Sequence, residues 1–102
     1  MRHEYDSFEA TLAMAAGDDQ GLADELRRTF ADSVARQVDL LKRARCDGNW
    51  LVAAQRLKSL ASSFFAQELI ELADLAIESA PGDPVAVRRL EDFVSDMRTG
   101  QN

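Results

Sequence analysis

Hydrophobic residues recur at the three- and four-residue intervals of an α-helix along almost the whole chain. No stretch shows the strict alternation of β-branched and polar residues that a half-buried strand requires. We therefore predict an all-α fold, namely an antiparallel four-helix bundle with a short additional N-terminal helix. The 102 residues suffice for one domain with a single core. The core bundle is expected over about residues 20–98, and residues 1–19 form the leading helix and turn.

The first two helices are predicted over about residues 4–16 and 20–46. Gly17 is placed to end the first, and Asp18 and Asp19 offer N-caps to the second. One face of the first helix is apolar: Tyr5, Phe8 and Leu12. The second carries a longer apolar stripe: Leu22, Leu26, Phe30, Val34, Val38 and Leu41. Three acid-first i,i+4 pairs are expected on its solvent side: Asp24 with Arg28, Asp32 with Arg36, and Asp39 with Arg43.

The third helix is predicted to follow residues 47–49, which close the second helix and cap the next. It begins at Trp50 and places its core residues within about 100° of arc. These are Trp50, Ala53, Ala54, Leu57, Leu60, Ala61 and Phe64. If the helix continued in phase beyond Phe65, Glu68 and Glu71 would point into the core, and burial of unpaired carboxylates is very costly. The chain is therefore expected to turn near Phe65.

The last two helices complete the predicted bundle. The fourth covers about residues 67–80 and returns along the third. Its apolar positions are Leu69, Leu72, Ala73, Ala76, Ile77 and Ala80. Residues 81–83 end it, and Asp83 as N-cap with Pro84 at the first helical position starts the fifth helix, before Gly100. The apolar face of the fifth helix is Val87, Leu90, Val94 and Met97.

Composition narrows the classes of function. A net charge of −6 without a basic block argues against nucleic acid or an anionic membrane as a partner. The N-terminus leads into no apolar signal segment, so a cytoplasmic location is expected. Cys46 is the only cysteine and is expected to be a buried or half-buried structural thiol. His3 is the only histidine and lies outside the bundle, where a frayed terminus is expected. No metal site, cofactor or catalytic acid/base pair is indicated, so we do not expect an enzyme.

The third helix carries a more specific pattern. Its central segment reads Gln55-Arg56-Leu57-Lys58-Ser59-Leu60-Ala61-Ser62-Ser63-Phe64-Phe65-Ala66, followed by Leu69, Leu72, Ala73 and Glu78. This segment resembles the His-x-Leu-Lys-Gly pattern and its continuation in the histidine-containing phosphotransfer (HPt) domains of bacterial two-component signalling. The resemblance covers about residues 20–98 and is strongest at about 47–80, where the entry through residues 47–51 is also similar. It implies the same bundle that the periodicity predicts.

Three positions depart from the HPt pattern. Gln55 stands in place of the phosphoacceptor histidine, Ser59 replaces a glycine beside it, and Phe65 replaces a glycine at the turn. A glutamine amide nitrogen is delocalised into its carbonyl and is a very poor nucleophile, so phosphotransfer at this position should be lost. The chain therefore resembles a degenerate HPt domain that lacks its acceptor.

Gln55 is expected about 160° away from the core direction of its helix, on a polar face. The predicted partner-binding surface consists of Leu51, Val52, Gln55, Lys58, Ser59, Ser62 and Phe65. The resemblance places Lys58 close to the phosphoryl group of an HPt domain, where its charge would favour an acidic receiver pocket. An ordinary solvated face remains the alternative. Trp50 is expected in the core rather than at an interface.

Three functions stay open at this point. The first is a non-catalytic HPt-like module that binds a response-regulator receiver domain or a histidine kinase and modulates a phosphorelay. The second is a structural or dimerising bundle, in which Leu51, Val52 and Phe65 would be buried against another copy. The third is an active phosphotransfer protein whose acceptor histidine was replaced by Gln55, either as an engineered substitution or with another residue as the acceptor. The sequence leaves the partner, the sign of regulation and the oligomeric state undetermined.

Overall fold

The computed structural model describes the backbone of residues 2–99 and the side chains of residues 7–99. All regular structure in this part of the chain is helical, which confirms the all-α prediction. The helices are α1 (Arg2–Ala16), α2 (Gln20–Lys42), α3 (Asp47–Ser63), α4 (Gln67–Glu78) and α5 (Pro84–Thr99). The side chains of His3, for which we expected a frayed terminus, and of Tyr5, which we placed on the apolar face of the first helix, lie outside the described residues.

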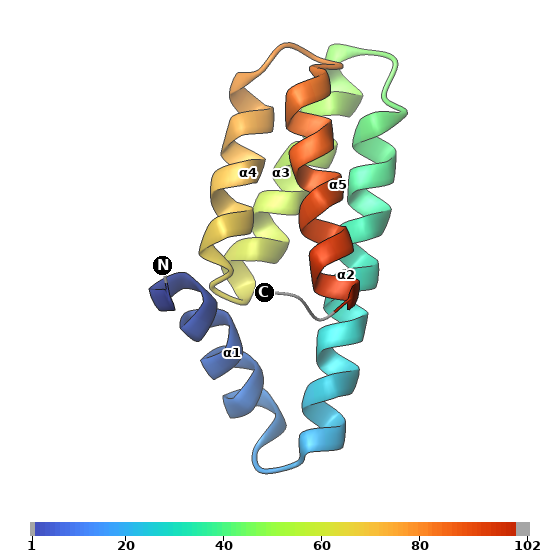
Figure 1. The fold of residues 1–102 in the computed structure, drawn as a ribbon. Coiled ribbons are helices and arrows are strands. Elements are labelled where there is room, and N and C mark those ends of the chain that lie inside the picture. The colour runs from blue at the N-terminus through green and yellow to red at the C-terminus, as the bar shows by residue number, and fades with distance from the viewer. Residues whose placement is uncertain (1, 100–102) are drawn as a thin grey trace.

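Helices α2 to α5 stand side by side, and each packs against two others of the four (Figure 1). The packed pairs are α2 with α3, α3 with α4, α4 with α5, and α5 with α2. The loops 43–46 and 79–83 lie at one end of this group, while the loop 64–66 lies at the other end (Figure 1). The four helices therefore enclose a common core, and the short loops place consecutive helices beside each other.

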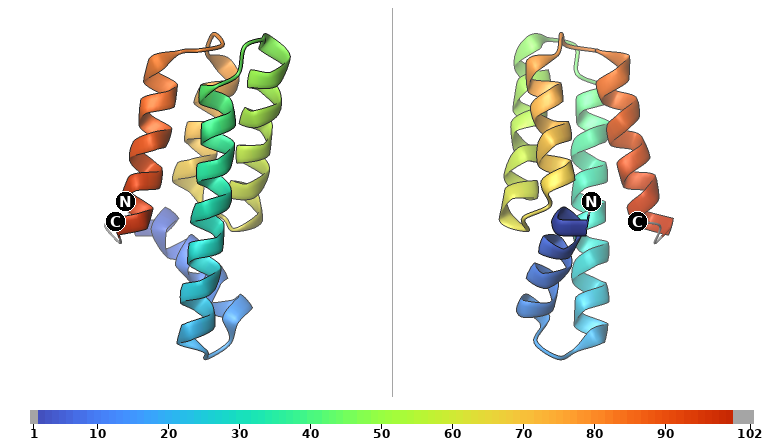
Figure 2. Two further views of the ribbon diagram at one scale, coloured as in Figure 1. Left: turned by 90° about the vertical axis from the view of Figure 1, so that its right-hand side faces the viewer. Right: turned by 60° about the vertical axis from the view of Figure 1, so that its left-hand side comes forward.

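Helix α1 lies against the N-terminal half of α2, below the ends of α3 and α4 (Figure 2). Three aromatic rings join it to the rest of the structure. The ring centroid of Phe30 on α2 lies 5.0 Å from that of Phe8 on α1 and 4.9 Å from that of Phe64, which follows α3. All three rings are tilted against one another, an arrangement that adds to the free energy gained by burial. Leu12, only 1% exposed, provides the second anchor of α1.

The core contains most of the residues that helical periodicity assigned to it. Those that are almost fully buried include Phe30, Val34, Val38, Leu41, Trp50, Ala53, Ala54, Leu57, Ala61, Leu69, Ala73, Ala76, Leu90 and Val94. Leu22 is an exception and remains 39% exposed, because it lies in the first turn of α2, beyond the reach of α3 to α5 (Figure 1). Ala80 is exposed as well, and Ala86 on α5 is buried although the apolar pattern did not include it.

The second helix is shorter than predicted, since α2 ends at Lys42 rather than near residue 46. Residues 47–49 do not form a cap but belong to the first turn of α3, for which Cys46 is the N-cap without a side-chain hydrogen bond. The Trp50 amide donates to the Cys46 carbonyl and closes that turn. Asp47, predicted as a cap, instead stabilises the helix as an acidic residue near the positive end of the helix dipole.

The helix ends around α4 and α5 follow familiar backbone rules. Helix α4 ends at Glu78 and not near residue 80, because the residue before Pro81 is disfavoured in the helical conformation. Asp83 caps α5 as predicted: its Oδ2 accepts a hydrogen bond from the Ala86 amide at 3.1 Å. Asp19 likewise caps α2 through the Leu22 amide, and Gly17 follows α1 with a positive φ of 67°.

The ion pairs on α2 correct two of the three predictions. Asp39 pairs with Arg43 as expected, at 3.3 Å. Asp24 pairs with Arg27 rather than Arg28, at 3.0 Å. Arg27 also forms an ion pair with Glu9 on α1, so this one arginine binds two carboxylates. Burial alone would lower the pKa of Arg27, but hydrogen bonds and charge from Glu9 and Asp24 outweigh it and raise this pKa above its usual value.

The remaining predicted pair, Asp32 with Arg36, is replaced by a contact between helices. Asp32 Oδ1 accepts a hydrogen bond at 2.8 Å from Arg98 at the end of α5. A carboxylate on α2 therefore fastens the last turn of α5, and Arg36 is left without an ion pair to the residues that the structure describes.

Candidate protein-binding surface

The outward side of α3 gathers six of the seven predicted surface residues: Leu51, Val52, Gln55, Lys58, Ser59 and Ser62. All six are exposed, and by the helical repeat they fall within about 120° of arc along about 17 Å of helix. The opposite side of the same helix is buried in the core and carries Trp50, Ala54 and Leu57. Because the core holds α3 in one orientation, this surface has a fixed direction towards solvent. We call these six residues together with Phe65 the α3 surface.

Gln55 lies at the centre of the α3 surface and is solvent-exposed. Its primary amide can donate and accept hydrogen bonds but cannot act as an acceptor of a phosphoryl group. The chain's single histidine is His3, which the sequence places more than fifty residues away on another helix. Gln55 therefore offers hydrogen bonds at the α3 surface but no nucleophile for a phosphoryl group.

Lys58 forms an ion pair that links α3 to α4. Its Nζ lies 2.9 Å from Asp74 Oδ1, and both side chains are less than half exposed. Exposed pairs of this kind contribute about 0.2–1 kcal/mol, so a partner carboxylate could exchange with Asp74 at little cost. The positive charge of Lys58 is thus held beside Gln55 while remaining accessible.

Phe65 ends α3 in a conformation that favours glycine. Its φ is +55°, and it is the only described non-glycine residue with a positive φ. The Ala66 amide donates to the Ala61 carbonyl at 2.8 Å, and the Phe65 amide donates to the Ser62 carbonyl at 3.2 Å. These two hydrogen bonds form a Schellman motif, in which the position of Phe65 is normally glycine. A large side chain therefore occupies a strained backbone position.

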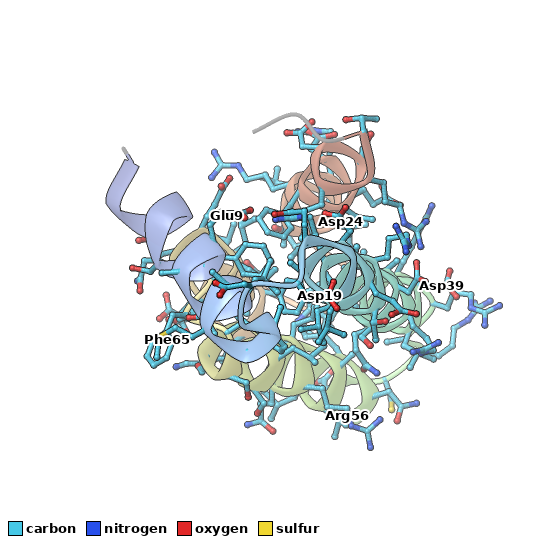
Figure 3. All side chains as sticks on the ribbon, turned by 90° about the horizontal axis from the view of Figure 1, so that it is seen from below. Glu9, Asp19, Asp24, Asp39, Arg56 and Phe65 are labelled. Carbon is cyan, nitrogen blue, oxygen red and sulfur yellow. The ribbon has the colours of Figure 1, made fainter. Side chains whose placement is uncertain are left out.

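Burial of the Phe65 ring contributes little free energy to offset the backbone strain. It is 62% exposed, and Figure 3 shows it pointing away from the helices at the end where α1 lies. Strain at non-glycine residues in this region costs of the order of 1–2 kcal/mol. An exposed aromatic side chain at a strained backbone position is typical of a protein-binding surface.

Replacement of Phe65 by glycine should raise the free energy of unfolding by about 1 kcal/mol, because the strain is relieved and little buried surface is lost. Urea denaturation followed by circular dichroism measures the difference. Phe65→Ala is the matched control, since it removes the same ring but keeps the strained Cβ, and should change stability by less than about 0.5 kcal/mol. A less stable Phe65→Gly protein would contradict this account of the turn.

Leu51 and Val52 provide exposed apolar area next to Gln55. They are 40% and 45% exposed, whereas their neighbours Trp50 and Ala53 are buried. Two aliphatic side chains flanked by polar groups match the composition of a small interface centre with a polar rim.

Trp50 is a core residue, as predicted: it is 2% exposed, and its Nε1–H donates to the Ala76 carbonyl of α4 at 2.8 Å. The prediction for Cys46 was wrong, because this thiol is exposed. Cys46 precedes the first turn of α3 in an extended conformation, so its side chain lies outside the core.

Neither a metal site nor a membrane helix is found in the part of the chain that the structure describes. No group of three or more histidine, cysteine, aspartate or glutamate side chains there could hold a metal ion. Among the same residues, no helix has both the length and the apolar character needed to cross a bilayer.

The groove beside the α3 surface was not predicted from the sequence. It lies between α2 and α3 and contains Arg36, Arg43 and Arg56. Arg36 and Arg43 are separated by seven residues, a spacing that places them on one side of a helix and could have indicated a shared role.

Comparisons of the chain with protein-family models, with curated proteins and with solved structures found no match.

Proposed function

We propose that this chain is a non-catalytic HPt-like protein that binds a two-component signalling partner, either a response-regulator receiver domain or a histidine kinase. In this proposal α2 to α5 form an antiparallel four-helix bundle of the HPt kind. The positions of the three connecting loops and the closed ring of helix contacts support that interpretation. Binding of the partner modulates a phosphorelay without any phosphoryl transfer to this protein.

The observation that carries the proposal is the place of Gln55. It is exposed at the middle of α3, at the position that the HPt pattern gives to the acceptor histidine. Three framework positions of the pattern are buried, which supports the proposal: Leu57 and Leu69 are completely buried, and Ala66 is 6% exposed. In the proposal, the protein has the framework of an HPt hairpin without its reactive histidine.

The surroundings of Gln55 favour a partner with an acidic pocket surrounded by apolar residues. Lys58 and Arg56 supply positive charge, while Leu51 and Val52 supply apolar contact area. Replacement of an imidazole by a neutral amide leaves the shape of this surface largely intact. Such a protein would compete with active phosphotransfer domains for the same receiver or kinase.

The proposal is tested with purified receiver and kinase domains from the same genome, using isothermal titration calorimetry. At least one domain should bind, and Leu51→Glu should weaken that binding about tenfold or more, because it places a carboxylate at the apolar centre of the surface. Leu22→Glu is the matched control, since Leu22 is 39% exposed against 40% for Leu51 but lies at the far end of α2. Absence of binding to every such domain would count heavily against the proposal.

A dimerising bundle is the second candidate, and the exposure of Leu51, Val52 and Phe65 favours it. A second copy would bury all three side chains. Light scattering over a dilution series distinguishes the two functions: a dimer that Leu51→Glu dissociates supports this candidate, whereas a monomer at all concentrations excludes it.

A further inference from the structure

A groove runs between α2 and α3 along one edge of the α3 surface. It consists of two adjoining hollows of about 560 Å³ and about 340 Å³, and Gln37 and Arg56 line both. Val52 lines the larger hollow and Ser59 the smaller, so the groove and the α3 surface share residues. Figure 3 shows Arg56 pointing outward from α3 at this edge.

The charge of the groove is opposite to that of the whole protein. The chain carries a net charge of −6, yet three arginines and no aspartate or glutamate are found among the described residues that line the groove. They are Arg36, Arg43 and Arg56. A concave surface with one sign of charge concentrates the local electrostatic potential, so this groove attracts negative groups that the rest of the molecule repels.

The guanidinium groups are largely available to a ligand. Arg43 pairs with Asp39 on its own helix at 3.3 Å, with both side chains more than half exposed, and such a pair is readily exchanged. Neither Arg36 nor Arg56 forms an ion pair with any residue in the described range 7–99, and both are exposed. Arginine forks bind carboxylates with two parallel hydrogen bonds, which gives such a contact a defined geometry.

The spacing of the arginines fits an extended series of negative charges better than a single small anion. Arg36 and Arg43 are two helical turns apart, or about 10 Å along α2. The groove as a whole follows α3 over residues 49–63, which is about 21 Å of helix. Leu40, 42% exposed, and Val52 supply apolar area in its larger hollow.

Gln37, which lines both hollows, carries an unsatisfied polar atom. Gln37 Oε1 is buried and accepts no hydrogen bond from the described residues. Buried acceptors normally have a donor, which a peptide N–H entering the groove would supply.

From these observations we propose that the α2–α3 groove binds an acidic segment of a partner protein, with carboxylates on Arg36, Arg43 and Arg56 and aliphatic side chains on Leu40 and Val52. The inference does not depend on the partner being a signalling protein. The groove is a second recognition site that adjoins the α3 surface, and its arginines add charge-based specificity to the contacts of Lys58, Leu51 and Val52.

The test uses a fluorescein-labelled peptide of about 15 residues with glutamate at every third position and leucine between the glutamates. In an extended chain this spacing places the glutamates about 10 Å apart, which matches Arg36 and Arg43. Anisotropy is measured at about 0.1 M salt, where the Debye length of about 10 Å screens remote carboxylates more than the groove's own arginines. The peptide should bind, and Arg36→Gln with Arg56→Gln should weaken binding about tenfold. Arg88→Gln with Arg89→Gln, an equal charge change on exposed positions of α5, should leave it unchanged.

A charge-reversed variant separates loss of binding from loss of folding. The protein with Arg36→Glu and Arg56→Glu should reject the glutamate peptide and bind the version in which lysine replaces glutamate. No binding of the glutamate peptide to the native protein, or equal weakening by the α5 variant, overturns the proposal. Full competition by inorganic phosphate alone at similar concentration overturns it in favour of a small-anion site. Self-association that Arg36→Gln with Arg56→Gln abolishes overturns it in favour of a second copy of this chain.

Discussion

Replacement of Trp50 by alanine is expected to lower the free energy of unfolding by about 3–5 kcal/mol. Trp50 is 2% exposed in the core between α3 and α4, so the change leaves a large cavity. It also removes the hydrogen bond from the indole N–H to the Ala76 carbonyl. Domains of this size have a total stability of about 5–15 kcal/mol, so the variant should be close to unfolding at physiological temperature. Thermal denaturation followed by circular dichroism measures the loss.

Two further variants separate packing from hydrogen bonding. Trp50→Phe keeps most of the ring volume and should cost about 1–3 kcal/mol, because the Ala76 carbonyl still accepts the Ser79 amide at 3.2 Å. Leu51→Ala, next to Trp50 but 40% exposed, should cost less than about 1 kcal/mol. Equal losses in Trp50→Ala and Leu51→Ala would show that the orientation of α3 described above is wrong.

Phe30→Ala is expected to cost a similar amount, about 3–5 kcal/mol. Phe30 is 3% exposed and is the middle ring between Phe8 and Phe64, so its removal weakens the contacts of α1 and of the α3–α4 turn together. Chemical denaturation gives the size of the loss.

Hydrogen exchange tells whether α1 shares the cooperative unfolding of the other helices. Phe8→Ala should increase amide exchange in α1 much more than in α3 and α4, because Phe8 anchors only the first helix to this cluster. Phe30→Ala should increase exchange in all of them. If Phe8→Ala increased exchange equally throughout, α1 would be an integral part of the core rather than a helix docked on it.

The sequence was sufficient to predict the helices because their apolar positions repeat with the helical period over about two or more turns. The turn near Phe65 was also predictable, since a continuous helix would have buried Glu68 and Glu71, and both are exposed. The ends of helices were less well predicted. Residues 47–49 have the composition of a cap, but the Trp50 amide donates to the Cys46 carbonyl, so these residues form the first turn of α3.

The ion pairs could not be predicted from α2 alone. Asp32 prefers Arg98, which is far away in the sequence, and Arg27 is drawn towards Glu9 on α1. Helical spacing describes only the pairs within one helix, whereas the choice among partners depends on which helix lies alongside.

The exposed α3 surface followed from the sequence, since the residues opposite a strongly apolar face must point to solvent. The strain at Phe65 did not follow, because a positive φ depends on how the chain leaves α3. The α2–α3 groove could not be predicted either, because its residues come from two helices and only the fold shows that these helices are in contact.

Phosphotransfer to a Gln55→His variant tests the proposed function most directly. The native protein and the variant are incubated with radiolabelled phospho-receiver domains, and the label on each is followed over time. Labelling of Gln55→His with no labelling of the native protein is the predicted result, because the surface is retained and only the nucleophile is missing. Labelling of the native protein, or no labelling of the variant even when Ser59→Gly and Phe65→Gly are added, would contradict it.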